Sequence, residues 1–426
     1  EPTNLKFALA GAVNAATQRV AVLDSSEFGS FPSYYLSNNG INNIPQVYGW
    51  AWQGATTAPN IVALNTALER GYFPFMFDRS LELGADTVVV KIDKVKEPEK
   101  LFDAAQKLGY KLIAQSPLTY TFKVDVPAQF ATSVTYDAIA IGRYAPNIGY
   151  MFPGFELGNS VYFDEYKEDE LSRYRAIFLS GFKYHDKQKA EQLALALSRR
   201  GVKVLIDLAG TDTSLLSSRS SFLEVSAQPI SFDDNFPKLQ LPDTDVVIKT
   251  LPFEQTLKHW NTFYVENVDN VTGFSWLQKQ KINFMGTKDN DNLVFMGFNL
   301  IFHASETHDE GVIEFIEQTI GVPTNQLPTR KIVPIEVTYG VNSINIKSSE
   351  INVMTSLASL DAFQVTSGEI FTKHNLLCMG TNEVNIKIGF PHWKTGLFVT
   401  FIGLLMLGGL WYLMFYRKKT RKGVIK

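Results

Sequence analysis

The chain has 426 residues, of which 19% are charged and 13% are aromatic, and its formal net charge is −3. Because so small a net charge gives no broad basic surface, we expect no nucleic-acid partner. The single cysteine, Cys378, excludes an intrachain disulfide and any metal site built from several cysteines, and the sequence indicates no cofactor. The length suits two or three folded units of roughly 100–200 residues each.

Residues 1–135 are predicted to form a small α/β domain. Helices are expected to open at Pro59 and Pro74 and to close at Gly71 and Gly84, because proline suits the first helical turn and glycine the residue after the last. The other elements predicted from apolar periodicity are the strands Arg19–Asp24, Thr87–Ile92, Tyr110–Gln115 and Thr119–Val124 and the helix Glu97–Leu108.

An aromatic, glycine-rich loop is predicted between Phe28 and Gly54, after the first strand. Ligands of α/β sheets bind at the carboxyl ends of strands, where exposed aromatic rings can stack on sugar faces and amides can bond hydroxyl groups. The alternative is that these rings pack against another part of the protein. The candidate ligand-binding residues of this loop are Asp24, Tyr34, Tyr35, Tyr48, Trp50, Trp52 and Gln53.

Two pairs of carboxylates in this domain are candidates for acid/base chemistry. Asp24 and Glu27 flank the start of the aromatic loop, and Asp78 and Glu82 are four residues apart on a predicted helix. Residues at that spacing lie on the same helical face. The ordinary interpretation of either pair is a solvated surface.

Residues 136–330 are predicted to form a parallel-sheet domain. The strand Ala176–Leu179, a helix capped by Asp186 and the strand Val202–Asp207 make a βαβ unit, which implies parallel strands. A strand at Leu293–Phe298 and a helix at Asp309–Ile320 complete the domain. Residues 210–290 resemble an insertion.

Ser180 and Asp207 end neighbouring strands of this sheet, so we expect them at one cleft. No Gly-x-Gly-x-x-Gly or Walker pattern and no Gly-x-Ser-x-Gly motif accompanies them. His303 and His308, with nearby carboxylates, could in principle bind a metal, but the H-E-x-x-H spacing is absent. We therefore interpret the two histidines as a surface cluster and expect no metal site.

The C-terminal part is predicted to hold a β domain and a membrane anchor. Short alternating strands from Lys331 onward indicate a membrane-proximal antiparallel β domain at 331–392. The segment Gly396–Phe415 is uncharged, and a helix of that length spans a bilayer core of about 30 Å. The basic run RKKTRK in the tail 417–426 places the C-terminus in the cytoplasm, with the transmembrane helix at 393–416 and the bulk of the chain outside the cell membrane.

Two stretches of the first domain carry a family resemblance: RVAVLDSSEFGSFPSYYLS, and YGWAWQGATTAPNIVALNTALERGYFPFMFDRSLELGADTVVVK. They resemble the extracytoplasmic part of bacterial polytopic membrane proteins labelled 6-pyruvoyl-tetrahydropterin synthase-related, over roughly the first 125 residues. These are similar to type-C membrane glycosyltransferases and imply a role in exopolysaccharide assembly, without pterin chemistry. The resemblance implies further transmembrane spans before Glu1 and a possible membrane-domain partner.

The second unit, with YRAIFLSGFKYHDKQKAEQLALALSRRGVKVLIDLAGT, resembles a glutamine-amidotransferase-like flavodoxin fold. Enzymes of that group use a cysteine after a strand, and none stands there in this sequence. The resemblance therefore implies a binding or spacing module and not an amidotransferase.

These observations leave three hypotheses for the function. The first is an extracytoplasmic region that binds or positions a glycan or lipid-linked sugar and carries no catalytic site of its own. The second is a surface scaffold or receptor that binds a protein partner. The third is a membrane-anchored glycan hydrolase that uses Asp24, Glu27 or Asp207.

Overall fold

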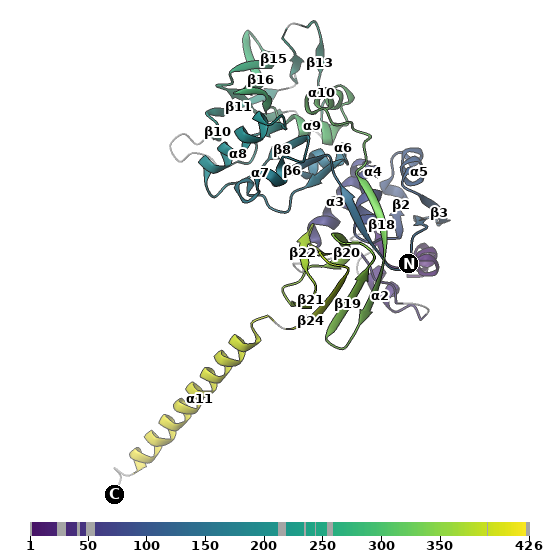
Figure 1. The fold of residues 1–426 in the computed structure, drawn as a ribbon, viewed down its shortest axis with the longest axis vertical. Coiled ribbons are helices and arrows are strands. Elements are labelled where there is room, and N and C mark those ends of the chain that lie inside the picture. Colours follow the sequence, from purple (N-terminus) through teal and green to yellow (C-terminus); the bar gives the residue numbers. More distant parts are fainter. Residues whose placement is uncertain are drawn as a thin grey trace.

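The computed structural model describes residues 2–23, 31–40, 43–47, 56–211, 219–233, 236–242, 244–253, 259–389 and 391–422 (Figure 1). These residues form a mixed α/β protein with four sheets and one long apolar helix at the C-terminus.

The first unit is built around a four-stranded sheet with the order β1-β2-β4-β3, in which only β1 and β2 are parallel. The predicted helix ends are confirmed, because Gly71 closes α3 in the left-handed conformation at φ 78° and Gly84 follows α4 at φ 77°. The elements are α1 Pro2–Ala15, β1 Val20–Val22, α2 Phe31–Ser37, α3 Ala58–Arg70, α4 Phe73–Glu82, β2 Thr87–Lys91, the 3-10 helix Ile92–Lys94, α5 Pro98–Lys107, β3 Tyr110–Gln115 and β4 Thr119–Val124.

Part of the predicted aromatic loop is helical. Residues 31–37 form α2, in which the rings of Phe31 and Tyr35, four residues apart, stack with centroids 5.6 Å apart. Leu36 is buried with side chains of α1 and β1. The expectation of a loop is therefore wrong for these residues, because one helical turn lets the aromatic and apolar side chains share a buried face.

The second unit contains five parallel strands with helices between them. Its elements are β6 Ala138–Ile141, α6 Pro146–Met151, β7 Phe155–Leu157, the 3-10 helix Phe163–Glu165, α7 Glu168–Leu171, β8 Ala176–Ser180, α8 Lys187–Arg199, β9 Lys203–Asp207, β17 Asn290–Met296, α9 Leu300–Thr307 and α10 Glu310–Ile320. The parallel strands lie in the order β7-β6-β8-β9-β17, which is 2-1-3-4-5 in chain order. The predicted βαβ unit is confirmed, and Asp186 caps α8 by accepting a hydrogen bond from the backbone of Lys189.

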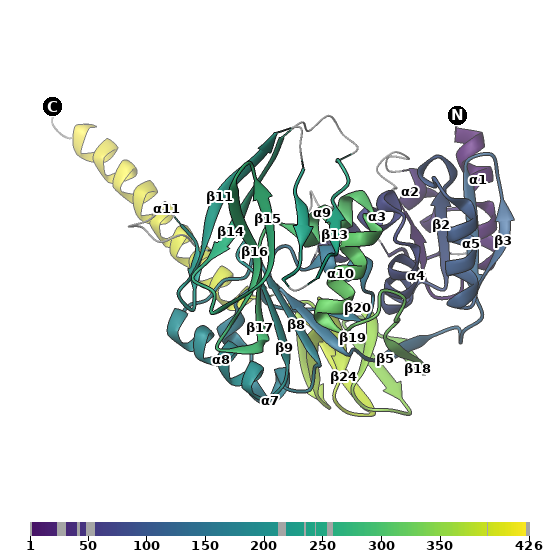
Figure 2. The ribbon, with the colours of Figure 1, turned by 90° about the horizontal axis from the view of Figure 1, so that it is seen from above.

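Helices cover both faces of this parallel sheet (Figure 2). Along β8, Ile177 and Leu179 are buried with apolar residues of α8, whereas Phe178 belongs to the core that includes α9 and α10. The strand is therefore apolar on both faces, as parallel strands between two helical layers are.

Residues 210–290 supply seven described strands, of which four extend this sheet. Those strands are β10 Ser221–Phe222, β11 Val225–Asp233, β12 Lys238–Gln240, β13 Val247–Lys249, β14 His259–Glu266, β15 Asn270–Leu277 and β16 Gln280–Lys288. Four of them continue the parallel strands as an antiparallel extension in the order β13-β12-β15-β16-β17. The other three form a separate sheet, β10-β11-β14.

The third unit is an eight-stranded sheet with the order β21-β24-β19-β18-β5-β20-β23-β22. Its strands are β5 Phe130–Thr135, β18 Thr329–Tyr339, β19 Ser343–Ser348, β20 Val353–Ala358, β21 Phe363–Ser367, β22 Ile370–Lys373, β23 Leu376–Met379 and β24 Glu383–Ile388. The antiparallel strands expected after Lys331 are confirmed, but residues 130–135 also belong to this sheet. Since β5 pairs with β18, the chain leaves this sheet for the second unit through one strand and returns through its neighbour.

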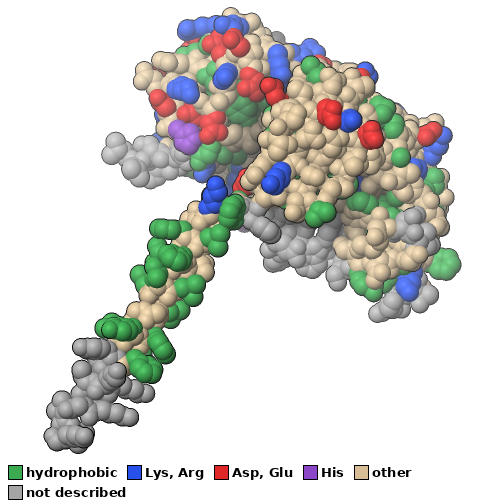
Figure 3. All heavy atoms as spheres, turned by 60° about the horizontal axis from the view of Figure 1, so that its bottom comes forward, with side chains coloured by type: hydrophobic (Ala, Val, Ile, Leu, Met, Phe, Trp, Pro, Cys, Tyr) green, Lys and Arg blue, Asp and Glu red, His purple; other side chains and the backbone are tan. Residues whose placement is uncertain are grey.

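The helix α11, Trp393–Lys422, extends away from the rest of the molecule (Figure 1). Its segment Trp393–Phe415 is long and apolar enough to cross a membrane, and none of its apolar window is buried against the described residues. Hydrophobic side chains line the part of this helix whose side chains are described (Figure 3). Because no described part of the chain covers these side chains, membrane association is the simplest use of the helix.

Candidate functional site

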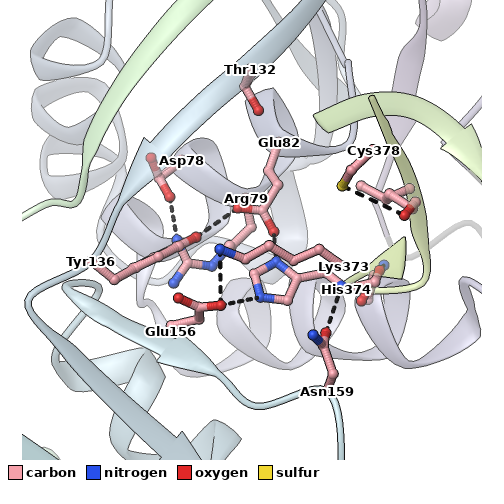
Figure 4. A network of polar contacts seen from close by, with 12 residues as sticks. Asp78, Arg79, Glu82, Thr132, Tyr136, Glu156, Asn159, Lys373, His374 and Cys378 are labelled. Carbon is pink, nitrogen blue, oxygen red and sulfur yellow. Dashed lines mark hydrogen bonds and ion pairs between the residues drawn. The ribbon is translucent and has the colours of Figure 1, made fainter. Parts of the chain in front are cut away.

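Two places in the molecule gather polar side chains from distant parts of the chain. The first is a buried cluster where the three units meet, which we call the charge junction (Figure 4). Its members come from α4, β7, β18 and the end of β22, and they are Asp78, Arg79, Glu82, Glu156, Arg330, Lys373 and His374.

Arg330 of β18 joins both carboxylates of α4. Its guanidinium donates two hydrogen bonds to Asp78, at 2.9 and 2.8 Å, and one to Glu82 at 2.8 Å. The Asp78 side chain is 1% exposed and that of Arg330 is 5% exposed. The two carboxylates do share a helical side, but the expectation of a solvated face is wrong, because an arginine 252 residues away neutralises Asp78 inside the protein.

His374 connects all three units. Its Nδ1 lies 2.6 Å from Glu82 Oε1, its backbone N–H donates to Asn159 at 2.8 Å, and its carbonyl accepts from Asn60 at 2.8 Å. Its Nε2 lies 3.6 Å from Glu156 Oε1, an ion-pair distance. The turn that carries His374 therefore has partners on α3, on α4 and beside β7.

The pKa values in the charge junction follow from these pairs. Burial alone would lower the pKa of His374, but the carboxylates of Glu82 and Glu156 raise it above its ordinary value. Burial alone would raise the pKa of Glu156, but His374 and the charge of Lys373 lower it to about 2. Burial is likewise outweighed at Glu82, whose pKa His374 and Arg330 hold well below its usual value. The histidine thus favours its protonated form and the carboxylates their ionised forms.

The second place is a cavity of about 510 Å³ at the carboxyl ends of the parallel strands, which we call the cleft. The strands β8, β9 and β17 end here, and β14 closes one side. The lining residues are Tyr144, Asn147, Ser180, Asp207, Ala209, Gly210, Asn261, Thr262, Phe263, Asn299, Ile301 and Phe302. Among the described residues, the lining contains one carboxylate and no lysine or arginine.

Ser180 and Asp207 meet at the floor of the cleft, as their positions at neighbouring strand ends predict. Ser180 Oγ donates to Asp207 Oδ2 at 3.1 Å, and the backbone N–H of Ala209 donates to Oδ1 at 2.9 Å. Asp207 is 4% exposed, and burial raises its pKa to about 6 although both hydrogen bonds act in the opposite direction. The carboxylate has no described cation to neutralise it.

Two polar side-chain atoms at the cleft have no hydrogen-bond partner among the described residues: Thr262 Oγ1 and Asn299 Oδ1. Asn299 belongs to a strained turn between β17 and α9, because Phe298 and Asn299 adopt φ values of 60° and 49°. Backbone bonds hold this turn, from Gly297 to Phe284 at 2.6 Å and from Phe298 to Phe263 at 2.7 Å. Non-glycine residues at positive φ cluster at functional sites, and unpartnered polar atoms retain capacity for a ligand.

The structure separates the residues that the sequence proposed as one binding set. Ser180 and Asp207 lie in the cleft, whereas Tyr34 and Tyr35 lie on α2 in the first unit, away from β8 and β9 in both ribbon views (Figures 1 and 2). Tyr34 is 64% exposed, and Tyr35 stacks on Phe31. The remaining candidates lie outside the described residues, and they are Asp24, Glu27, Tyr48, Trp50, Trp52 and Gln53.

Sequence reasoning missed Tyr144, Thr262 and Asn299. The rule that found Ser180 and Asp207, that parallel strands end at one edge, also applies to β17 and would have indicated Asn299. Thr262 lies on β14, a strand of the separate antiparallel sheet β10-β11-β14, and nothing in its local sequence marks it.

The interpretation of His303 and His308 as a surface cluster is wrong for His303. That residue is fully buried, stacks on Trp260 at 4.5 Å, and its Nε2 lies 2.8 Å from the carbonyl oxygen of Leu251. His308 stacks on Tyr72 instead. In the part of the chain that the structure describes, no group of three or more histidine, cysteine, aspartate or glutamate side chains is arranged to hold a metal ion.

Two domain families match the chain. Residues 7–135 match a domain of unknown function, DUF8559, and residues 137–303 match another, DUF8560. No curated protein matches the chain. The two matched segments meet at residue 136, where β5 of the antiparallel sheet passes into β6 of the parallel sheet.

Proposed function

We propose that this chain is the membrane-tethered, extracytoplasmic region of a protein of cell-surface polysaccharide assembly, and that its cleft binds a glycan or lipid-linked sugar. The observation that carries the proposal is the composition of the cleft, in which neutral amides and hydroxyls surround aromatic rings. The resemblance of the first domain to the 6-pyruvoyl-tetrahydropterin synthase-related membrane proteins supplies the biological setting.

The cleft has the groups that a sugar ring needs. Tyr144, Phe263 and Phe302 offer ring faces, while the amide side chains beside them can donate to and accept from hydroxyl groups. Thr262 and Asn299, which each hold a buried oxygen atom without a described partner, line the same cavity. A phosphate group fits the cleft itself poorly, since no described cation lines it, so the phosphate of a lipid-linked sugar would lie outside.

The strand order of the second unit supports a flavodoxin-like organisation. In doubly wound sheets with the order 2-1-3-4-5, ligands bind outside the carboxyl ends of the strands, where the strand order reverses. Here the reversal lies between β6 and β8, and Tyr144 and Ser180, which follow or end those strands, both line the cleft. The volume of about 510 Å³ also lies within the usual range for small-molecule sites.

The orientation in the membrane is part of the proposal. Five cations lie between Arg417 and Lys422, directly after the apolar segment, and such clusters remain on the cytoplasmic side. The folded units, and with them the cleft, would then lie outside the cytoplasmic membrane. A reporter fused after Lys426 tests this orientation. In inverted vesicles, whose outer face is the cytoplasmic one, a protease added from outside should cleave the reporter.

We propose binding and not hydrolysis. Glycosidases use two carboxylates about 5–9.5 Å apart. The described lining of the cleft contains only Asp207 as a carboxylate, so the pair that hydrolysis requires is not found there.

The decisive experiment measures binding of bacterial surface oligosaccharides to the full chain in nanodiscs, for the wild type and two variants in the cleft. Tyr144→Ala removes a ring face and Asn299→Ala removes an amide acceptor, and we expect each to weaken binding by about tenfold. Tyr34→Ala is the matched control, because it removes an exposed tyrosine from α2. If Tyr34→Ala weakens binding and the two cleft variants do not, the sugar binds at the aromatic segment of the first unit and the proposal is wrong.

A further inference from the structure

The cleft holds a negative charge that its own lining does not neutralise. Asp207 is the one carboxylate in the described lining, and no described arginine, lysine or histidine stands there to pair with it. Its two hydrogen bonds come from neutral donors, the hydroxyl of Ser180 and the backbone N–H of Ala209. Because buried carboxylates are normally paired with a cation, Asp207 is placed to pair with one that a ligand brings.

The carboxylate of Asp207 can accept further hydrogen bonds. An ionised carboxylate offers about four lone-pair positions, and the two bonds use one on each oxygen. Its pKa of about 6 leaves it mainly ionised near neutral pH. Asp207 lines the cavity although it is only 4% exposed, so a donor that reaches it leaves bulk water. An attraction between opposite charges is stronger there than at an open surface.

The other walls of the cleft also suit a cation better than an anion. Tyr144, Phe263 and Phe302 contribute aromatic rings to the lining, and such rings attract an ammonium group placed over their faces. The other polar side chains of the described lining are neutral, and they are Asn147, Ser180, Asn261, Thr262 and Asn299. A sugar that carries a carboxylate or a phosphate would instead bring a second negative charge beside Asp207.

We propose that the cleft selects sugars that carry a free amino group, and that Asp207 recognises the ammonium form of that group. The inference rests on the proposed function, because it names the class of sugar that the same site would bind. The carboxylate would accept charge-assisted N–H bonds from the ammonium group, which are stronger than bonds between neutral partners. N-acetylation removes the charge, so an acetylated sugar would leave Asp207 without a cation.

The test compares two sugars that differ only at nitrogen, a glucosamine tetrasaccharide and its fully N-acetylated counterpart. Each is titrated by calorimetry into the full chain in nanodiscs of neutral lipid, near neutral pH. We expect the amino sugar to bind about tenfold more tightly. The inference is overturned if the acetylated sugar binds equally well or better, or if neither binds. The proposed function is overturned only if no bacterial surface oligosaccharide binds.

Asp207→Asn removes the charge and keeps the shape of the side chain, so the two tetrasaccharides should bind this variant with similar affinity. The matched control is Asp291→Asn, which changes an exposed aspartate at the amino end of β17, whereas the cleft lies at the carboxyl end. Both variants change the net charge of the chain by one unit. Equal loss of the preference in both would show a general attraction to an acidic chain and would overturn the inference.

A simple amine separates the ammonium group from the sugar. Ethylamine, titrated in the same way, should bind at least about tenfold more weakly than the amino sugar, because it has no hydroxyl groups to bond the amides of the cleft. If ethylamine binds as tightly as the amino sugar, the recognition of an ammonium group by Asp207 stands and the proposed binding of a sugar is wrong.

Discussion

The charge junction and the cleft are both polar, but the charge junction pairs its carboxylates and the cleft does not. In the charge junction, Asp78 and Glu82 share the guanidinium of Arg330. In the cleft, Asp207 is buried without a cation among the described residues, and Thr262 and Asn299 each keep an atom that no described group partners. Paired buried groups hold a structure together, whereas unpaired ones cost stability unless a ligand compensates. The charge junction therefore holds the units together, and the cleft is the place for which we propose ligand recognition.

The largest effect is expected from Arg330→Met. The substitution keeps much of the aliphatic volume but removes the guanidinium that Asp78 and Glu82 share, so that Arg79 remains the only described cation paired with Asp78 and His374 the only described one paired with Glu82. Breaking a buried ion pair on one side costs about 3–5 kcal/mol. Chemical unfolding of the detergent-solubilised chain should show this loss of unfolding free energy.

The neighbouring residue provides the control for Arg330→Met. Lys331 pairs with Glu350 at the surface, and its side chain is mostly exposed. Lys331→Ala should change the unfolding free energy by less than about 0.5 kcal/mol. Equal effects of the two substitutions would show that Arg330 does not hold the units together.

Asp207→Asn should raise the free energy of unfolding, whereas Arg330→Met should lower it. The pKa of Asp207 is raised from 3.8 to about 6, so the favourable contribution of its protonated form is complete below pH 3.8 and is lost as the pH rises through about 6. Removing the charge should therefore stabilise the chain at pH 8, by up to about 3 kcal/mol, and leave it unchanged at pH 4. Oligosaccharide binding should weaken in the same variant, because asparagine offers one acceptor fewer.

A destabilised Asp207→Asn chain at pH 8 would contradict this account of the cleft. It would mean that the ionised carboxylate has a partner that compensates its burial. Thermal unfolding at both pH values, with Ser180→Ala as a control that keeps the charge, distinguishes the two cases.

The contribution of the charge junction to folding stability should depend on pH less steeply than that of Asp207. The pKa of His374 is raised, so its contribution to stability is fully present below pH 6.5 and is lost as the pH rises through its folded-state value. The pKa values of Glu82 and Glu156 are lowered, so their contributions are present above pH 4.5 and are lost on acidification. The effect of His374 is limited, because Arg330 and Lys373 still neutralise the carboxylates at high pH.

The measurement is the unfolding midpoint between pH 6.5 and 8.5 in wild type and in His374→Gln. The wild-type midpoint should fall over this range, and the glutamine variant should show a smaller fall. If the midpoint falls equally with pH in the wild type and in His374→Gln, the group that titrates over this range is not His374.

Local features of this fold could be predicted from the sequence. Asp186 and Asp309 cap their helices, because each side chain accepts a hydrogen bond from the backbone N–H three residues later in the chain. Glycines close α3 and α10. These signals depend on contacts within a few residues, which the sequence displays directly. The meeting of Ser180 and Asp207 was predictable as well, because a βαβ unit fixes neighbouring parallel strands.

The distant pairings could not be predicted in this way. The bond from Arg330 to Asp78 joins residues 252 positions apart, and β5 pairs with a strand that starts almost 200 residues later. Neither contact leaves a periodic pattern in the chain. The left-handed turn at Phe298 and Asn299 was equally hidden, because neither residue is glycine.

The smallest effect is expected from Thr262→Val, and comparing it with Thr355→Val distinguishes an unpartnered buried hydroxyl from a hydrogen-bonded one. Thr262 Oγ1 has no partner in the described structure, so Thr262→Val should leave the unfolding free energy unchanged or raise it by a few tenths of a kcal/mol. Thr355, buried in β20, donates to the carbonyl of Leu377 at 2.7 Å and accepts from the backbone of Leu357 at 3.2 Å. Thr355→Val should therefore cost about 1–2 kcal/mol, although the change in shape is the same. If Thr262→Val proves as costly as Thr355→Val, the hydroxyl of Thr262 is already used within the protein, and the cleft loses one of the two atoms that mark it as a binding site.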